Sequence, residues 1–432
     1  MAKIIVTTAG VERHVLTFVP IVSNLVNRGH KIVWISTNRF QSTIQDTGAS
    51  FVSMMEDQDQ LPLDYSYEQK KYPVKSGSCI LKTRRKILKD FQSRTQPIMN
   101  LLERVLSFFT PDLYLSDSLS YGTFLTAEKY KKPNIVVHTS PYLLPESYHL
   151  SFCGKIPFLE KLLGSFGSRI ASFLFKKLIL KDVLVHINQV RQNIDLYPFK
   201  DLYKDMHSLS KEVLITSLAP LENGSFHTPA NFQYVGPLLE TSQTVFREPD
   251  WWNELDECRP VILINQVSIV QDPSELILPL VHAMKDEYVL FVVYPVVKKL
   301  KNLPDNVRTL SSVPLANILP KTDLLITNGS CDTIQMALAY GVPMIIADNL
   351  EGNKHENYPV QHYGAAIHLK NKTLSGDHLK NTVLEILQDR KFKVCANSLQ
   401  KHIRQTDPVQ DISNIVEHYT SCPLPEPIEE TC

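Results

Sequence analysis

Residues 323–348 have the sequence DLLITNGSCDTIQMALAYGVPMIIAD. Two short apolar runs, 324–326 and 344–347, enclose a polar turn and a segment with helical character at 333–340. This order predicts a strand, a helix and a second strand, with the polar turn at the carboxyl end of the first strand. Ligands bind at that edge of a parallel sheet, and the N-terminus of the following helix attracts anions there. Taken alone, the stretch fits a phosphate-binding turn and an ordinary βαβ repeat without a ligand equally well.

The totals favour a globular protein with more than one domain. The chain has 432 residues, of which 43% are hydrophobic and 21% charged, and this length suits two domains of about 200 residues each. Lys and Arg together number 45, the same as Asp and Glu. A chain without net charge has no general attraction to polyanions, so nucleic acid is disfavoured as a partner.

The ends and the cysteines predict a cytoplasmic location. The chain begins Met-Ala-Lys and enters a predicted strand at residues 4–8, which is unlike a signal peptide or a membrane anchor. No apolar run reaches the roughly 18 residues that a membrane span needs. The seven cysteines have no CxxC or CxxxC spacing, so we expect reduced thiols and neither a disulfide framework nor a zinc site.

Apolar runs and helical spacing alternate along both halves, which predicts parallel sheets. We expect strands at 3–8, 31–36, 113–115, 134–138 and 212–216 in the first half, and at 261–265, 288–293, 307–310, 324–326 and 344–347 in the second. Long helical segments are predicted at 82–109, 378–390 and 396–420. The expected domains are 1–236, an interdomain linker 237–258, a second domain 259–400, and a C-terminal helix 401–420 that packs back on the first domain.

Polar residues follow several of these strands. His14 follows the first strand and can act as a general base, although a surface-loop histidine explains this residue more simply when it is taken alone. Asp117 ends another strand and would meet His14 at the same edge of a parallel sheet; the alternative is an Asx turn or a helix cap. Gln266 and Ser268 end the first strand of the second half, where they are either phosphate ligands or ordinary strand-end polarity.

Six blocks occur in the order typical of one family: RHVLTFVPIVSNLVNRGHKIVWIS, PDLYLSDS, QYVGPLLE, RPVILINQVS, LPDNVRTLSSVPLANILPK, and the opening stretch with its extension NLEGNKHEN. Together they resemble the GT-B glycosyltransferases, the nucleotide-sugar-dependent enzymes that modify macrolides and other natural products. Plant and animal glucosyl- and glucuronosyltransferases are related to them. The resemblance covers nearly the whole chain and is strongest over residues 259–370.

The resemblance implies an α/β protein with two facing Rossmann-like parallel-sheet domains. The N-terminal domain would bind the acceptor and the C-terminal domain the nucleotide sugar. The implied reaction is an inverting, metal-independent transfer of a hexose from a UDP- or dTDP-sugar to a hydroxyl of a small hydrophobic acceptor, either a natural product or a lipid-like molecule. No cofactor is implied besides the nucleotide sugar, which is a co-substrate.

The family pattern also assigns residues. His14 falls on the position of the catalytic base and Asp117 on that of the carboxylate that orients it. The donor-binding positions are Gln266, Ser268, Val313, Asn328, Gly329, Ser330, Thr333, Asn353 and Lys354. Within these, the turn 328–333 would bind the diphosphate, the backbone of Val313 would meet the nucleobase, and Asn353 and Lys354 would grip the sugar.

Several site positions differ from the family pattern, namely Arg13, Val267, Leu315, Ser330, Asp332, Met336 and Asn353. Arg13 stands in place of a glycine, and Asp332 puts a carboxylate where the family has Gly or Asn. Met336 replaces the Glu or Gln that holds ribose. These differences support a second hypothesis, in which the chain is a catalytically degenerate relative that binds a ligand or a partner protein.

Residues 161–181 are both basic and apolar. Such a segment fits weak contact with a membrane surface, and it fits the wall of an acceptor pocket better, because its apolar residues also suit core packing. The expected oligomeric state is a monomer or a homodimer.

Overall fold

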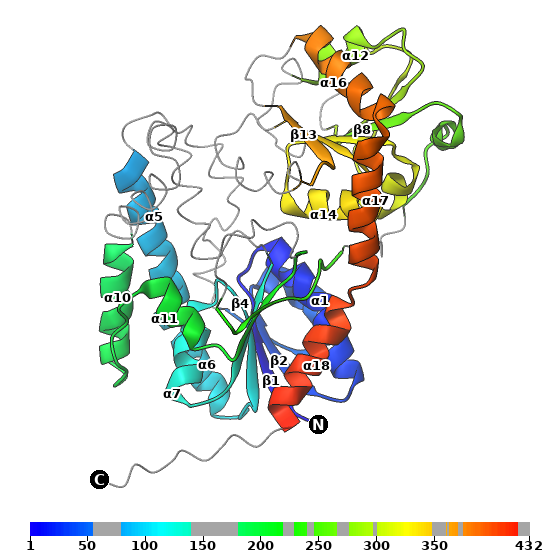
Figure 1. Cartoon of the computed structure of the whole chain (residues 1–432). Helices are drawn as coiled ribbons and strands as arrows, with labels where there is room; N and C mark the ends of the chain where they lie inside the picture. The colour runs from blue at the N-terminus through cyan, green and yellow to red at the C-terminus, as the bar shows by residue number, and fades with distance from the viewer. Residues whose placement is uncertain are drawn as a thin grey trace.

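The computed structural model describes residues 1–54, 79–139, 180–218, 229–239, 246–265, 276–296, 300–347, 360, 363–369 and 375–421. Figure 1 shows two α/β domains joined by the C-terminal helices. The elements of the first domain are β1 (Lys3–Thr7), α1 (Glu12–Asn27), β2 (Lys31–Ser36), η1 (Asn38–Phe40), α2 (Gln41–Gln45), β3 (Ser50–Ser53), α5 (Cys79–Arg94), α6 (Gln96–Leu106), β4 (Leu113–Asp117), α7 (Tyr121–Lys129), β5 (Asn134–His138), α10 (Lys181–Gln192), α11 (Leu202–Ser208), β6 (Glu212–Ile215) and β7 (Phe232–Tyr234).

The second domain repeats this alternation. Its elements are η4 (Trp252–Asp256), β8 (Val261–Asn265), α12 (Ile277–Ala283), β9 (Leu290–Tyr294), β10 (Val307–Thr309), α13 (Leu315–Ile318), η5 (Leu319–Lys321), β11 (Leu324–Thr327), α14 (Cys331–Ala339), β12 (Met344–Ala347), β13 (Ala366–Leu369), α16 (Gly376–Gln388) and α17 (Arg390–Arg404). The last helix, α18 (Pro408–Ser421), follows α17 after a short break.

Each domain is built on a parallel sheet. Within the part of the chain that the structure describes, the first sheet has seven strands in the order β3-β2-β1-β4-β5-β6-β7, and the second has six in the order β10-β9-β8-β11-β12-β13. All pairings are parallel in both sheets. In each sheet the chain begins at a central strand, β1 or β8, and adds the next two strands on one side of it. The following strands are then added on its other side, as in Rossmann folds. The predicted fold class, two Rossmann-like parallel-sheet domains, is confirmed.

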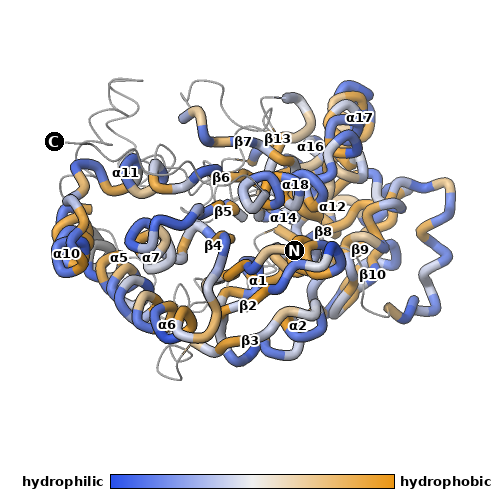
Figure 2. Tube along the Cα trace, turned by 90° about the horizontal axis from the view of Figure 1, so that it is seen from below, coloured by the Kyte–Doolittle hydropathy of each residue, from blue (hydrophilic) through white to orange (hydrophobic). Residues whose placement is uncertain are grey.

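Burial of both sheet faces explains why the strands are mostly apolar. Helices cover both faces of a parallel sheet, so its strands are buried on both sides. Every residue of β4 and of β8 is buried, and in β1 and β2 only the first residue is exposed. Figure 2 shows this distribution, with apolar residues along β2 and a mixture of polar and apolar residues on the outlying helix α10.

The structure differs from the predicted elements in two helical regions. The helical region 82–109 is two helices, α5 and α6, which break at Thr95, and the region 396–420 is also two helices, α17 and α18. A proline follows each break, Pro97 in the first turn of α6 and Pro408 at the start of α18. Proline lacks a backbone N–H and its ring clashes with the preceding helical turn, so it suits the first turn of a helix and not the interior, and each break has a local cause. The strands β3, β7 and β13 were not predicted.

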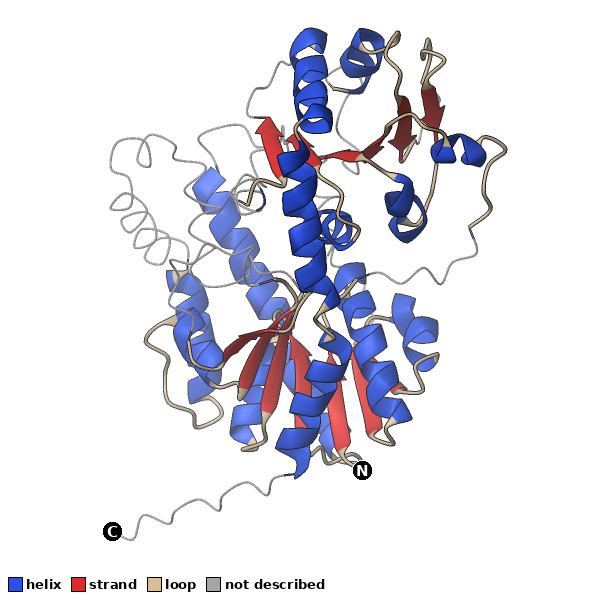
Figure 3. Ribbon diagram, turned by 45° about the vertical axis from the view of Figure 1, so that its right-hand side comes forward, coloured by secondary structure: helices blue, strands red, loops and turns tan. Residues whose placement is uncertain are grey.

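The C-terminal helices connect the two domains. Helix α17 packs on α14 of the second domain, whereas α18 packs on α1 of the first, and Figure 3 shows them running one after the other across the molecule. Ile412 and Val416 of α18 are fully buried in the core of the first domain. Glu417 accepts hydrogen bonds from Arg28 at 2.8 Å and pairs with His30 at 3.0 Å. Among the described residues, none of the helices is long and apolar enough to span a bilayer.

Candidate active site

Both sheets reverse their strand order at one point, and the candidate residues lie at these two points. In the first sheet the reversal is between β1 and β4, and in the second it is between β8 and β11. Ligands of open α/β sheets bind at such switch points, beyond the carboxyl ends of the strands. His14 follows β1 and Asp117 ends β4, whereas the turn 328–330 follows β11. The topology therefore directs both groups of residues to ligand-binding positions.

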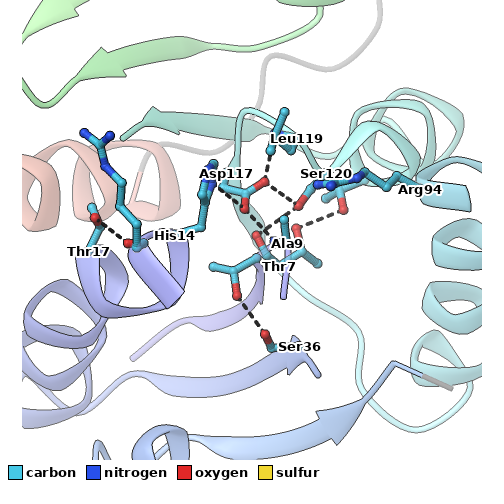
Figure 4. A network of polar contacts seen from close by, with 12 residues as sticks. Thr7, Ala9, His14, Thr17, Ser36, Arg94, Asp117, Leu119 and Ser120 are labelled. Carbon is cyan, nitrogen blue, oxygen red and sulfur yellow. Dashed lines mark hydrogen bonds and ion pairs between the residues drawn. The ribbon is translucent and has the colours of Figure 1, made fainter. Parts of the chain in front are cut away.

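His14 and Asp117 form a buried pair (Figure 4). His14 lies in the first turn of α1, and its Nδ1 is 3.1 Å from Oδ2 of Asp117. Only 7% of the His14 surface is exposed, and Asp117 is fully buried. The strands place them, because β1 and β4 are direct neighbours and their carboxyl ends lie side by side. The structure thus brings together the two residues that the sequence placed on the same sheet edge.

The carboxylate of Asp117 is fixed by further donors. Its Oδ2 accepts the backbone N–H of Ala9 at 2.5 Å, and its Oδ1 accepts the N–H of Leu119 at 2.9 Å and the hydroxyl of Ser120 at 2.8 Å. The bond to Leu119 is an Asx turn, so that alternative explanation of Asp117 is also correct. Asp117 makes the turn and holds His14 at the same time.

Asp117 is ionised in this setting. Burial alone would raise the pKa of its carboxyl group, but the hydrogen bond and charge of His14 and the bonds from Ala9 and Ser120 outweigh burial and lower this pKa below its ordinary value. An ionised Asp117 can only accept, so His14 donates its Nδ1–H. In a neutral imidazole the Nε2 atom then carries the lone pair that can take a proton.

The turn after β11 is shaped to open a helix. Gly329 has φ of +85°, a conformation that favours glycine. Ser330 is the N-cap of α14, and its Oγ accepts the N–H of Thr333 at 3.4 Å and donates to Thr333 Oγ1 at 2.8 Å. Asn328 precedes this cap and is partly buried. The N-terminus of α14 carries a partial positive charge, so the turn can bind an anion.

Two contacts join the domains beside these groups. Arg13, the neighbour of His14, donates from Nη2 to Oδ1 of Asp332 in the first turn of α14 at 2.8 Å. Gln335, one turn further along α14, donates to the backbone oxygen of Thr216 after β6 at 3.2 Å. The His14–Asp117 pair and the anion-binding turn therefore face one another across the domain boundary.

The remaining predicted donor residues are placed differently or not described. Val313 lies between β10 and α13, and its side chain is buried in the core of the second domain. Only its backbone can therefore meet a nucleobase. Gln266, Ser268, Asn353 and Lys354 lie outside the described residues, as does nearly all of the segment 161–181.

Sequence reasoning missed two residues that organise the site. Ser120 was not singled out, although a serine three residues after a strand-end aspartate is a recognisable signal for a hydrogen-bonded turn. Arg13 was noted only as a departure from a glycine. Its partner, Asp332, lies in the other half of the chain, and no local pattern links the two.

Comparisons with known proteins show what this chain is similar to. Residues 275–418 match the family described as erythromycin biosynthesis protein CIII-like, C-terminal domain. Over 420 residues the chain is 26% identical to 4'-demethylrebeccamycin synthase of Lentzea aerocolonigenes, covering 96% of this chain and 99% of the relative. Over 218 residues it is 30% identical to UDP-glucosyltransferase avaP of Aspergillus versicolor, covering 49% of this chain and 48% of the relative.

A solved structure has the same fold. The spinosyn rhamnosyltransferase SpnG complexed with thymidine diphosphate superposes with a TM-score of 0.66 at 17% sequence identity, covering 96% of this chain and 100% of that one. The two parallel-sheet domains and this match agree on the fold. Over nearly its whole length the chain is similar to the GT-B glycosyltransferases of the natural-product type.

Proposed function

We propose that this glycosyltransferase moves a hexose from a UDP- or dTDP-sugar to a hydroxyl of a small hydrophobic acceptor, with inversion at the anomeric carbon and without a metal. The observation that carries the proposal is the buried His14–Asp117 pair, 3.1 Å apart, on the domain facing the turn of α14. A base on one domain and an anion site on the other suit attack from the side opposite the leaving group.

The base chemistry follows from the tautomer of His14. Its Nε2 takes the proton of the acceptor hydroxyl while that oxygen attacks the anomeric carbon. The bond from this carbon to the diphosphate oxygen breaks, and the nucleoside diphosphate leaves with the electron pair. Asp117 is a positioning residue: it holds the imidazole and stabilises the imidazolium that forms. General base catalysis of this kind contributes roughly 10²- to 10⁴-fold in rate.

The leaving group needs positive charge or hydrogen-bond donors as it departs. The N-terminus of α14 supplies backbone N–H groups and a partial positive charge, and Ser330 and Thr333 add hydroxyls beside it. Preorganised donors of this kind stabilise developing negative charge in place of a metal ion. The glycine at position 329 lets the backbone approach a phosphate closely.

The donor and acceptor classes rest on the relatives. The names of two of them specify a UDP-glucosyltransferase and a 4'-demethylrebeccamycin synthase, and a third was solved with thymidine diphosphate. These names support a uridine or thymidine diphosphate sugar and a hydrophobic natural product as acceptor. A lipid-like acceptor, cytoplasmic location and a monomeric or homodimeric state are further parts of the proposal that rest on the sequence.

The alternative, a degenerate homologue that only binds a ligand or a partner, is not favoured. Its support was the set of altered donor positions, but the base and its carboxylate retain a working geometry. The relatives that match are also named as transferases.

The test is a substrate panel on the purified full chain. Thermal shift with UDP, dTDP and GDP and with their hexose conjugates identifies the donor, and mass spectrometry with small hydrophobic natural products and lipid-like alcohols as acceptors identifies the product. We expect a hexose-sized mass increase that persists in EDTA and, by NMR, an anomeric configuration opposite to that of the donor. Absence of both a nucleotide-induced shift and a product across the panel would refute the proposal.

A further inference from the structure

Two residues that depart separately from the family pattern form one contact in the structure. Arg13 replaces a glycine beside the base, and Asp332 places a carboxylate in the first turn of α14. Their side chains meet across the domain boundary, with Nη2 of Arg13 2.8 Å from Oδ1 of Asp332. The same Nη2 also donates to the backbone oxygen of Thr139 at 2.5 Å, so the guanidinium is anchored on the first domain.

Asp332 by itself works against a diphosphate at the turn. A carboxylate in the first turn of a helix neutralises part of the positive charge that the N-terminus offers to an anion. It also repels a second negative charge placed nearby. A turn that carries Asp332 alone would therefore bind an anionic donor less well than a neutral turn.

We infer that Arg13 neutralises Asp332, and that this pair sets the affinity of the turn for the donor diphosphate. The inference rests on the proposed function, because it assigns the α14 turn to the nucleotide sugar. With both residues present, the net charge that they add is zero, and the N-terminus of α14 regains its attraction for phosphate. Arg13 and Asp332 both differ from the family pattern, and the charge of one then compensates the charge of the other.

The Arg13–Asp332 pair is less exposed than a nearby ion pair of the first domain. The Arg13 side chain is 30% exposed, and its partner Asp332 56% exposed. The nearby pair of Arg39 and Glu12 is 59% and 68% exposed, with a longer separation of 3.5 Å. Arg39 therefore provides a matched control, since its loss removes the same charge from the same domain but leaves the α14 turn unchanged.

The test is a double-mutant cycle on nucleotide binding, using Arg13→Gln, Asp332→Asn, the double variant and the control Arg39→Gln. Calorimetry with UDP and dTDP gives the dissociation constant for each protein at low ionic strength. We expect Arg13→Gln to weaken binding about tenfold, equivalent to about 1.4 kcal/mol. We expect Asp332→Asn to bind at least as tightly as wild type, and the double variant to return to within about threefold of it.

Steady-state kinetics provides a second readout. Arg13→Gln should raise the KM for the donor and leave the KM for the acceptor unchanged, and added salt should reduce the difference from wild type because it screens the charges. A loss of fold would instead affect both substrates, and the thermal midpoint of each variant checks for it. Arg13→Lys keeps the charge and should recover most of the donor affinity.

Any one of three results would overturn the inference. The first is that Arg13→Gln binds nucleotide as tightly as wild type. The second is that the double variant binds as weakly as Arg13→Gln, and the third is that Asp332→Asn alone weakens binding. Failure of the proposed function is distinguishable from these results. In that case wild type itself binds neither nucleotide and forms no product, and the inference falls with it.

Discussion

Replacing Asp117 by asparagine tests how the fold holds its base. The carboxylate accepts two backbone N–H groups, from Ala9 at 2.5 Å and Leu119 at 2.9 Å, through different oxygens. Asparagine has one accepting oxygen, so in either orientation its NH₂ group faces one of these N–H groups. A buried donor left unsatisfied costs about 1–3 kcal/mol, and a lost bond to a charged group about 1.5–3 kcal/mol. We predict a loss of about 2–5 kcal/mol in the free energy of unfolding.

Urea denaturation at neutral pH, followed by tryptophan fluorescence, measures this loss. The matched control is Ser120→Ala, which removes one neutral donor to the same carboxylate, at 2.8 Å, and should cost about 0.5–1.5 kcal/mol. Under folded conditions, Asp117→Asn should also reduce kcat by roughly 100-fold or more, because an amide does not fix the imidazole tautomer. A free energy of unfolding within about 0.5 kcal/mol of wild type would refute the hydrogen-bonding argument.

The same variant has a defined pH dependence. The pKa of Asp117 is lowered from its ordinary value of 3.8, so the unfolded chain binds a proton at a higher pH than the folded chain. The stabilisation by Asp117 is therefore fully present above about pH 5 and is lost as the pH falls through the folded pKa. Asn does not titrate, so the stability difference between the two proteins should shrink below about pH 4.

Three further variants test other parts of the structure. Burial lowers the pKa of His138 well below 6.5, and its Nε2 is 3.1 Å from Nε2 of His207; wild type should lose stability as the pH falls below 6.5, and urea midpoints from pH 5 to 7.5 should show a weaker dependence for His138→Gln. Gly236 has φ of +90°, and an added Cβ would lie 2.3 Å from Oγ1 of Thr406, so Gly236→Ala should destabilise the protein by at least about 1–2 kcal/mol in the same assay. Glu417 is 37% exposed, so loss of its ion pairs in Glu417→Gln should cost less than about 1 kcal/mol, and a larger loss would show that α18 depends on them.

Much of the fold follows from local sequence. Strands such as β2 and β8 were predicted at their observed bounds, because buried parallel strands are uninterrupted apolar runs. The weaker strand β7 has three residues with little burial, so it lacks that signal and forms only because β6 offers an edge. The breaks before α6 and α18 have a sequence signal, because each of these helices has a proline in its first turn.

The site was predictable in part, because its two main residues lie at the ends of predicted strands. His14 and Asp117 end neighbouring strands, so the parallel topology alone places them at one edge. The contact between Arg13 and Asp332 depends on how the two domains face each other. No helical or strand periodicity contains that information, and each residue taken alone looked like a defect.

The central claim is that His14 is the base of a glycosyl transfer. The most direct test measures kcat and the donor dissociation constant of wild type and His14→Ala with the best donor and acceptor from the panel. We predict that kcat falls by roughly 10²- to 10⁴-fold, while nucleotide binding at the α14 turn stays within about threefold of wild type. A variant that forms product at the wild-type rate would contradict the account.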